Sequence, residues 1–342
     1  MNEIKAETLI QVLSKMLGTE IICVDFHTKQ LHGGTVGDVQ LVMGNAKTTD
    51  GGELPYKIVL KSQKKWERYS DPDSWRREYD FYKSNFGALF YESFRWPECY
   101  HVEMNEEENE TQIWMEYIDG ISGLDLTGDM YKQAAEELGR FQGKLYAQPA
   151  YLQNLSNLSK VDYMKNFYLH YRSWNRVYDY IRSDDCVIPQ HLCKMLIDID
   201  ENADEIINRI EKLPIVLCHR DFWVTNIISS DGKIIVIDWD TSGWGYLGED
   251  MASLIADEAD IEHMVEYYRR CVPAYYKGFS EYVDISHITD NCVYEMILFL
   301  FGYRLVEWIM DAGSGNEIQD TDDERTLHIQ TLQKVYEMKN TN

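Results

Sequence analysis

The first third of the chain combines one amphipathic pattern with several short apolar runs. Across residues 6–17, apolar side chains recur at helical spacing, at Leu9, Ile10, Leu13, Met16 and Leu17, which predicts a helix. Short apolar runs follow at residues 21–26, 39–43, 56–61, 94–100 and 112–118. Runs of this length, separated by polar or glycine-rich segments, predict strands. The polar residues 45–54 are expected to form a hairpin loop.

The remainder of the chain is dominated by helical patterns. One helix is predicted at residues 74–85, between two of the strands. Seven further segments have spacing compatible with helices, at residues 130–146, 161–181, 190–213, 248–256, 261–279, 288–312 and 324–338. A polar break covers residues 311–322. Strands gathered near the start and helices gathered after them predict an α+β fold.

Length and composition fit a two-lobed protein. The chain has 342 residues, of which 44% are hydrophobic, enough for two lobes around a cleft. It shows neither an initial apolar run of signal-peptide type nor a stretch near the length of a membrane span. Its seven cysteines are scattered without a Cys-x-x-Cys pair, so neither a zinc site nor a disulfide framework is indicated. We therefore expect a cytoplasmic location.

The charge balance is strongly acidic. The chain has 33 basic and 58 acidic residues, for a formal net charge of −25. Nucleic acids and anionic membrane surfaces require basic patches, so neither is expected as a partner. An acidic protein would suit a cationic substrate, but solubility explains the same charge equally well.

The most informative chemistry follows two apolar strands late in the chain. The first strand ends in His219-Arg220-Asp221, with Asn226 five residues after the aspartate, and the second ends in Asp238. Phosphoryl transfer needs one carboxylate at the attacking hydroxyl and oxygen ligands on Mg²⁺. Asp221 suits the first role, as the catalytic residue, and Asn226 and Asp238 suit the second. The alternative is that His219 and Asp221 only satisfy a buried turn.

This constellation resembles the aminoglycoside phosphotransferase and choline kinase superfamily, the small-molecule relatives of the protein kinases. The resemblance implies a protein-kinase-like α+β fold with two lobes. Residues 1–118 would form a small nucleotide-binding lobe built on an antiparallel sheet, and residues 119–342 a larger, mostly helical lobe for catalysis and substrate binding. It also implies ATP or GTP as the phosphate donor and Mg²⁺ as the metal.

Four features near the constellation refine the resemblance. His219 is expected to brace the loop by hydrogen bonds, and Arg220 departs from the glycine common in small-molecule kinases of this superfamily. Asp250 matches a structural acid at the start of a helix. Only eleven residues separate Asp238 from Asp250, which leaves no room for a protein-kinase activation loop. A small-molecule acceptor is therefore expected.

Phosphate-binding groups are predicted in the first lobe. A glycine-rich turn between the first two strands would present its backbone to phosphate, and its candidate residues are Gly33, Gly34, Thr35 and Gly37. Lys61 closes the third apolar run and is the candidate phosphate-binding lysine, with Lys57 on the same strand face as the alternative. The other interpretation is that Lys61 is a solvated lysine on an edge strand.

Glu78 stands on an otherwise aromatic helix face. A carboxylate there is costly without a partner, and Lys61 would be that partner, as in the lysine–glutamate pair of kinases. The alternative is that Glu78 lies at the margin of the face and pairs with Arg76, with Arg77, or with no residue.

The resemblance also places a nucleotide-base pocket at residues 115–118. Met115 would lie at the back of this pocket. The carbonyl of Glu116 and the N–H of Ile118 would bond the edge of the base. The pattern does not distinguish ATP from GTP, and it carries no signal for an oligomeric state.

Acidic side chains of the second lobe are candidates for holding an amine-bearing acceptor. They are Asp257, Glu258, Asp260, Glu262, Glu307 and Asp311, with Trp308 as an aromatic neighbour. An aminoglycoside-like molecule, choline or ethanolamine would fit such a site, and a neutral sugar is a further option. The alternative is that residues 257–262 form an exposed turn and that Glu307 pairs with Arg304. A non-catalytic kinase-fold protein that binds nucleotide or serves a structural role is the competing function.

Overall fold

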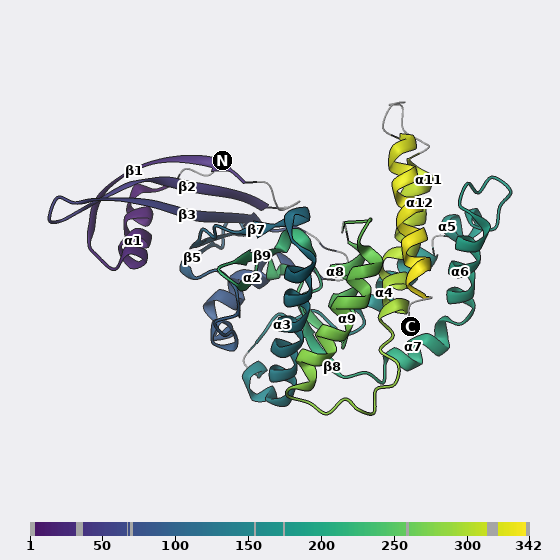
Figure 1. The fold of residues 1–342 in the computed structure, drawn as a ribbon. Coiled ribbons are helices and arrows are strands. Elements are labelled where there is room, and N and C mark those ends of the chain that lie inside the picture. The colour runs from purple at the N-terminus through teal and green to yellow at the C-terminus, as the bar shows by residue number, and fades with distance from the viewer. Residues whose placement is uncertain are drawn as a thin grey trace. The chain divides into compact units, whose positions relative to one another are not determined.

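The chain folds into two compact units in a computed structural model (Figure 1). The described residues are 4–31, 37–66, 68, 71–153, 155–173, 175–257, 260–312 and 321–339. The first unit consists of Met1–Gly120, Asn154–Asn157 and Ser230–Asp240. The second unit consists of Ile121–Gln153, Leu158–Ser229 and Thr241–Asn342.

The first unit is built on an antiparallel sheet in the order β1-β2-β3-β6-β5. Its strands are β1 (Ile21–Gln30), β2 (Gly37–Thr48), β3 (Glu53–Lys64), β5 (Cys99–Asn105) and β6 (Glu110–Glu116). Helix α1 (Ala6–Leu17) buries Leu9, Val12 and Leu13 against this sheet. The predicted first helix and the strands predicted at 21–26, 39–43, 56–61 and 112–118 are therefore confirmed.

Alternation along β3 sends its side chains to two different neighbours. Ile58 and Leu60 belong to the cluster that includes the apolar face of α1. Val59 belongs to a second cluster with Tyr79 of helix α2 (Ser74–Lys83). The odd-numbered residues of β3, which include Lys61, therefore face α2.

The run at residues 94–100 is two strands rather than the one predicted. Strand β4 (Phe94–Arg95) pairs in parallel with β10 (Lys233–Val236), and β5 begins only at Cys99. Pro97 lies between them and has no N–H to donate to a ladder. Trp96 stacks on Tyr82 of α2 with ring centroids 3.9 Å apart. A short 3₁₀ helix, Phe86–Leu89, follows α2.

The second unit is mostly helical. Its helices are α3 (Gly128–Ala147), α4 (Tyr163–Ser173), α5 (Asn175–Tyr180), α6 (Gln190–Glu201), α7 (Ala203–Ile210), α8 (Glu249–Ala256), α9 (Met264–Ser280), α10 (Val293–Ile297), α11 (Tyr303–Asp311) and α12 (Thr321–Met338). Strand β8 (Ile215–Cys218) pairs with β11 (Gly243–Tyr246), and β7 (Ile121–Ser122) pairs with β9 (Ile227–Ser230). The predicted α+β architecture is confirmed.

Three segments predicted as single helices are interrupted. Residues 161–181 contain α4 and α5. Residues 190–213 divide at Asn202, whose side chain donates to the carbonyl of Asp198 at 2.7 Å and so competes with helix continuation. In the segment 288–312, Cys292 has a left-handed backbone with φ of 54°, and a π-helical turn covers Leu298–Gly302. Side-chain bonds to the backbone and local backbone conformation override the apolar periodicity at these points.

Helices α3 and α9 lie side by side and approach closely at glycines (Figure 1). A Cβ atom at Gly139 of α3 would lie 2.0 Å from the carbonyl oxygen of Tyr275, and one at Gly278 of α9 would lie 2.1 Å from that of Glu136. Only a residue without a side chain fits such distances. In the described parts of the chain, no helix combines the length and the apolar character that crossing a membrane requires.

Candidate active site

Lys61 is buried between two carboxylates in the first unit. Its Nζ lies 2.6 Å from Oε2 of Glu78 and 2.6 Å from Oδ1 of Asp238. Strand β3 presents Lys61 toward α2, which carries Glu78, while Asp238 follows β10. The predicted contact between Lys61 and Glu78 is confirmed.

The alternative partners in this region are engaged elsewhere. Arg76 forms an ion pair with Asp80, one turn later in α2, at 3.0 Å. Its partner is therefore Asp80 and not Glu78. Lys57, the alternative lysine, is exposed and lies 5.2 Å from the centroid of the Tyr117 ring. Lys61 is therefore neither solvated nor on the edge of the sheet, because β3 lies between β2 and β6.

The electrostatics of this cluster keep Lys61 charged. Burial alone would lower the pKa of Lys61, but the carboxylates of Asp238 and Glu78 outweigh burial and raise its pKa above the ordinary value. Burial raises the pKa of Glu78, and the Lys61 ammonium opposes that rise. The two carboxylates therefore fix the position of the ammonium and keep it protonated.

The segment after β10 is held by side chains from β3 and α2. Asp238 has a left-handed backbone with φ of 64°. Arg77 is almost fully buried, and its Nη1 donates to the carbonyl of Asp240 at 2.5 Å. Gln63 donates to the Asp240 carboxylate at 3.4 Å. Burial, and next the charge of Asp238, raise the pKa of Asp240 to about 6.

Sequence reasoning did not identify Arg77 as part of this cluster. Arg77 also binds Asp71 through two guanidinium nitrogens, at 2.9 Å and 2.6 Å. Its partner Asp240 lies 163 positions along the chain. No local pattern could indicate that contact, because arginine beside Glu78 on a helix reads as an exposed charge.

In the second unit, the loop after β8 is anchored by its backbone. Asp250 of α8 accepts hydrogen bonds from the backbone N–H of His219 at 3.0 Å and of Arg220 at 2.7 Å. The hydroxyl of Thr241 donates to the carbonyl of His219 at 2.7 Å. Arg220 has φ of 67°, so the chain turns sharply before Asp221.

Asp221 and Asn226 meet at the end of this loop. Nδ2 of Asn226 donates to the Asp221 carboxylate at 2.8 Å and to its carbonyl at 3.0 Å. The backbone N–H of Asp221 donates to Nδ1 of His219 at 3.3 Å. His219 is fully buried, which matches the bracing position predicted for it. Because the Asn226 amide nitrogen is directed to Asp221, its oxygen is the atom suited to a metal.

A buried network supports the loop from beneath, and sequence reasoning missed it. Nε2 of Gln142 on α3 donates to the carbonyl of Leu217 and to the carboxylate of Asp250, both at 2.9 Å. The hydroxyl of Tyr275 on α9 donates to the other end of the Gln142 amide. Burial raises the pKa of Asp250 to about 6, against the opposing hydrogen bonds from the loop.

The Arg220 side chain is buried among residues of the second unit. Its guanidinium donates to the hydroxyl of Ser159 and to the carbonyl of Trp244. It also lies over the Tyr163 ring, 4.6 Å from the centroid, and 3.5 Å from Glu249. Burial raises the pKa of Glu249 to about 7, which Arg220 opposes. The arginine that replaces the family's usual glycine at position 220 is therefore held by these contacts.

The predicted glycine-rich turn is only partly described. Gly33, Gly34 and Thr35 lie outside the described residues. Gly37 is the first residue of β2 and pairs with Gln63 of β3. Its backbone is therefore part of the sheet next to the strand that carries Lys61.

The predicted base pocket lies at the end of β6. Met115 is buried in the cluster that contains Val59 and Tyr79. The backbone N–H of Glu116 donates to the carbonyl of Glu98 at 2.8 Å, and its carboxylate binds Arg95 at 2.6 Å and 3.0 Å. Ile118 follows the strand and is half-buried. The Glu116 side chain is therefore paired with Arg95. The contact between the Glu116 carbonyl and the nucleotide base stays a prediction.

The acidic segment before α9 forms a turn. One carboxylate oxygen of Asp260 accepts from the backbone N–H of Glu262 at 3.0 Å, and the other lies 2.6 Å from Nδ1 of His263. Asp257 directly follows α8, and Glu258 lies outside the described residues. Residues 260–263 form a turn that leads into α9, as the alternative interpretation expected for this part of the segment.

The acids on α11 have different surroundings. Glu307 is buried, and burial raises its pKa. Asp311 binds Arg176 of α5. The Trp308 ring lies under the guanidinium of Arg304, 4.3 Å from its centroid. Arg304 therefore contacts Trp308 in place of the pairing with Glu307 that the alternative interpretation supposed.

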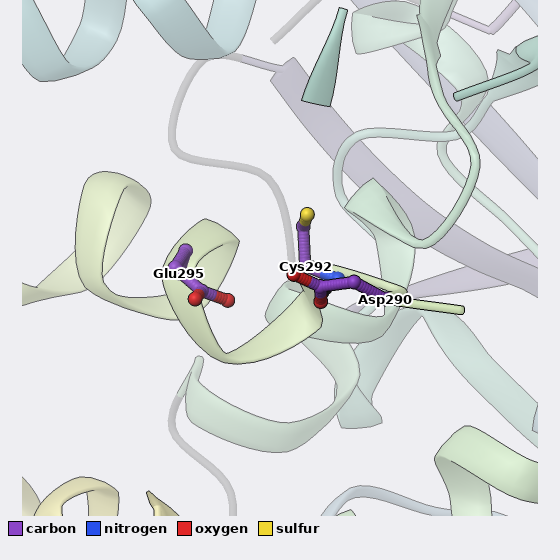
Figure 2. Close-up of side chains that lie close together, drawn as sticks. All are labelled: Asp290, Cys292 and Glu295. Atoms are coloured by element: carbon purple, nitrogen blue, oxygen red, sulfur yellow. Dashed lines mark hydrogen bonds between the residues drawn. The ribbon is translucent and has the colours of Figure 1, made fainter. Parts of the chain in front are cut away.

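One group of potential metal ligands occurs in the described residues away from these loops (Figure 2). The ligand atoms of Asp290, Cys292 and Glu295 all lie within 4.8 Å of one another. Arg209 donates to Asp290 at 3.1 Å and to Glu295 at 3.0 Å. The arginine already supplies the positive charge, so we interpret the group as an ion-pair cluster.

Comparison with a family model gives a match over most of the chain. The model of the phosphotransferase enzyme family matches residues 67–279, more than half of the chain. Comparison with curated proteins gave no match.

Solved structures share the fold at low identity. A choline kinase from Cryptosporidium parvum is 17% identical over 92% of this chain and 90% of its own, with a TM-score of 0.55. An aminoglycoside phosphotransferase, APH(2″), solved as its GDP and kanamycin complex, is 13% identical over 97% and 99%, with a TM-score of 0.58. A choline/ethanolamine kinase family protein from Mesorhizobium loti is 13% identical over 91% and 88%, with a TM-score of 0.54.

Proposed function

Because this chain belongs to the phosphotransferase enzyme family, we propose that it transfers the γ-phosphoryl group of ATP or GTP to a hydroxyl of a small molecule. The observation that carries the proposal is the Asp221 carboxylate, bonded by Asn226 at the end of a loop that Asp250 holds by its backbone. A carboxylate fixed in this way is suited to orient an acceptor hydroxyl and to take its proton.

The donor set around the loop fits a magnesium-bound nucleotide. Mg²⁺ prefers oxygen ligands and binds through few protein groups together with phosphates. The oxygen of Asn226 and the carboxylate of Asp238 would hold it, and the bound ion would neutralise charge on the phosphates. Sixteen residues lie between Asp221 and Asp238. We propose that the loop that carries Asp221 and Asn226 and the strand end at Asp238 act on the same bound nucleotide.

Lys61 supplies the second part of the proposed nucleotide site. It is buried and charged, and Glu78 fixes its position on the sheet. Its ammonium would bind the phosphates of the nucleotide. In phosphoryl transfer, positioning and charge stabilisation provide most of the catalysis. The residues of the glycine-rich turn, with Met115, Glu116 and Ile118, complete the proposed nucleotide contacts.

The acceptor is proposed to carry at least one amine. The formal net charge of −25 favours a cation. The Trp308 ring already holds the Arg304 guanidinium, so an acceptor amine that binds this ring would replace Arg304 there. Solved structures of this fold include a complex with kanamycin and a choline kinase. The candidate acids are those of residues 257–262 together with Glu307 and Asp311.

A turnover panel tests the acceptor. Purified protein is incubated with Mg²⁺ and ATP or GTP and with kanamycin, choline, ethanolamine or methylthioribose, and phosphorylated products are detected by mass. Amine acceptors should be preferred, and their apparent affinity should fall as salt rises because exposed charges are screened. A preference for the neutral sugar without salt dependence would overturn the amine proposal. Nucleotide binding without any transfer would favour the non-catalytic kinase-fold alternative.

A further inference from the structure

Two thiols of the second unit lie in contact. The sulfurs of Cys186 and Cys193 are 3.6 Å apart. Cys186 lies in the segment that joins α5 to α6, and Cys193 lies in the first turns of α6. All seven cysteines of the chain are free. A disulfide requires the sulfurs to approach to about 2.0 Å, roughly 1.6 Å closer than they lie here.

The backbone around the pair is held by bonds that do not depend on the thiols. The N–H of Cys186 donates to the carbonyl of Ser183 at 3.3 Å. The N–H of Val187 donates to the hydroxyl of Tyr180 at 3.1 Å. The N–H of Cys193 donates to the carbonyl of Pro189 at 3.2 Å. The segment can therefore keep its course while the two sulfurs close on each other.

The two thiols differ in access. Cys186 is half-buried and is followed by the exposed Val187, so solvent reaches this side of the pair. Cys193 is buried, and burial raises the pKa of its thiol to about 12. The more accessible thiol should react first with a dissolved oxidant, and the buried one should follow as its partner.

We propose that Cys186 and Cys193 form a reversible redox site, in which the two thiols are oxidised to one disulfide when the protein is exposed to a peroxide. The Cys186 thiolate attacks one peroxide oxygen, the O–O bond breaks, and hydroxide leaves. The sulfur of Cys193 then attacks the sulfenic acid on Cys186. The S–S bond forms, the S–O bond breaks, and water leaves with the Cys193 proton. Overall, two thiols and hydrogen peroxide give one disulfide and two waters.

The cross-link would fix the connection between two helices. Helix α6 is bonded to α11 through the Tyr303 hydroxyl, which donates to the carbonyl of Leu196 at 2.7 Å. Helix α5 contributes Arg176, which binds Asp311. A disulfide that closes the short loop before α6 restricts the unfolded chain and should raise thermal stability. This inference does not depend on the phosphotransfer activity.

The test is peroxide oxidation of the full-length reduced protein. After treatment with hydrogen peroxide, remaining thiols are alkylated in denaturant and peptides are mapped without reduction. We expect a peptide that joins Cys186 to Cys193, a rise of a few degrees in Tm, and loss of both with dithiothreitol. The exposed Cys23 is the internal reference and should oxidise without forming this cross-link.

Two single variants separate the steps. In Cys193→Ser, Cys186 should progress to sulfinic acid and no Tm rise should follow peroxide. In Cys271→Ser, which changes a buried cysteine of α9, the cross-link should form as in the wild type. Full alkylation of Cys186 and Cys193 at peroxide levels that oxidise Cys23 would overturn the proposal, and so would a cross-link that forms only with other cysteines.

Discussion

Lys61 and Lys57 stand four residues apart on β3, in surroundings that differ sharply. Lys61 is buried with two carboxylates at 2.6 Å, whereas Lys57 is exposed above a tyrosine ring. A charge that stabilises transferring phosphate contributes strongly only where water is excluded. The two lysines therefore form a matched pair for mutation.

We expect Lys61→Ala to lower kcat/KM for the nucleotide by about a hundredfold or more, because a preorganised cation is lost. Lys57→Ala should stay within about threefold of the wild type, as for an ordinary surface change. Steady-state kinetics of the two variants at matched fold, checked by circular dichroism, decide the point. A larger loss in Lys57→Ala would show that the choice of lysine is wrong.

Asn226 and Asp238 are proposed to act through the metal. Asn226→Ala and Asp238→Ala should each weaken Mg²⁺-nucleotide binding by about tenfold or more, since each removes an oxygen from the site. Titration calorimetry with Mg²⁺ and again with EDTA separates metal from nucleotide binding. If the loss is equally large in EDTA, the residues act on the nucleotide or on the fold and the metal assignment fails.

The sequence predicts some residue contacts well and others not at all. Lys61 and Glu78 could be paired in advance because a carboxylate on an aromatic helix face required a partner and the resemblance to kinases pointed to this lysine. Arg77, Gln142 and Tyr275 could not be anticipated. Their partners lie far along the chain, and a buried polar network leaves no periodic signal.

At the level of elements, the close approach of α3 and α9 rests on small residues. Gly139 lies where a Cβ atom would be 2.0 Å from a backbone oxygen of α9. Helix α3 also carries Gln142, which supports the loop before Asp221. The close packing of α3 against α9 therefore helps to fix the position of the side chain that supports the candidate catalytic loop.

Gly139→Ala should destabilise the protein by about 1–3 kcal/mol or more, because the backbones must separate. Gly128→Ala on the same helix is the control, since the added Cβ would crowd the flexible end of the Arg270 side chain and lie at an ordinary contact distance of 3.7 Å from Tyr267. That change should stay within about 0.5 kcal/mol. Urea unfolding of both variants gives the comparison, and equal stabilities would contradict the close-packing account.

The apolar periodicity of the sequence predicts most helices and strands, but it does not predict where they are interrupted. The first helix and four strands of the sheet were predicted from the pattern alone. The break at Asn202 and the π-helical turn at Leu298–Gly302 arise inside continuous apolar patterns. Such breaks depend on side-chain bonds to the backbone and on tertiary packing, which a periodicity does not record.

At the scale of the whole molecule, buried acids link stability to pH. Burial raises the pKa of Glu249 to about 7 from an ordinary value of 4.5. The folded protein therefore keeps a proton that the unfolded chain has lost. The contribution of Glu249 to the free energy of unfolding is therefore fully present below pH 4.5 and is lost as the pH rises to about 7.

Glu249→Gln removes this titration. Relative to wild type, its free energy of unfolding should increase by a few kcal/mol between pH 4.5 and about 7. Glu108→Gln, which changes an exposed glutamate, controls for the loss of one charge. Denaturant unfolding at several pH values measures the difference. A constant difference between Glu249→Gln and wild type across this range would contradict the burial effect.

The central claim is that Asp221 orients the acceptor hydroxyl and takes its proton during phosphoryl transfer. The most direct measurement compares product formation by wild type and Asp221→Asn with Mg²⁺, nucleotide and the acceptor panel, alongside calorimetric nucleotide affinity. Asp204→Asn, an exposed change on α7, is the control. The account predicts that Asp221→Asn loses at least about a hundredfold in kcat while nucleotide affinity stays close to wild type. Near-normal turnover in Asp221→Asn would contradict it.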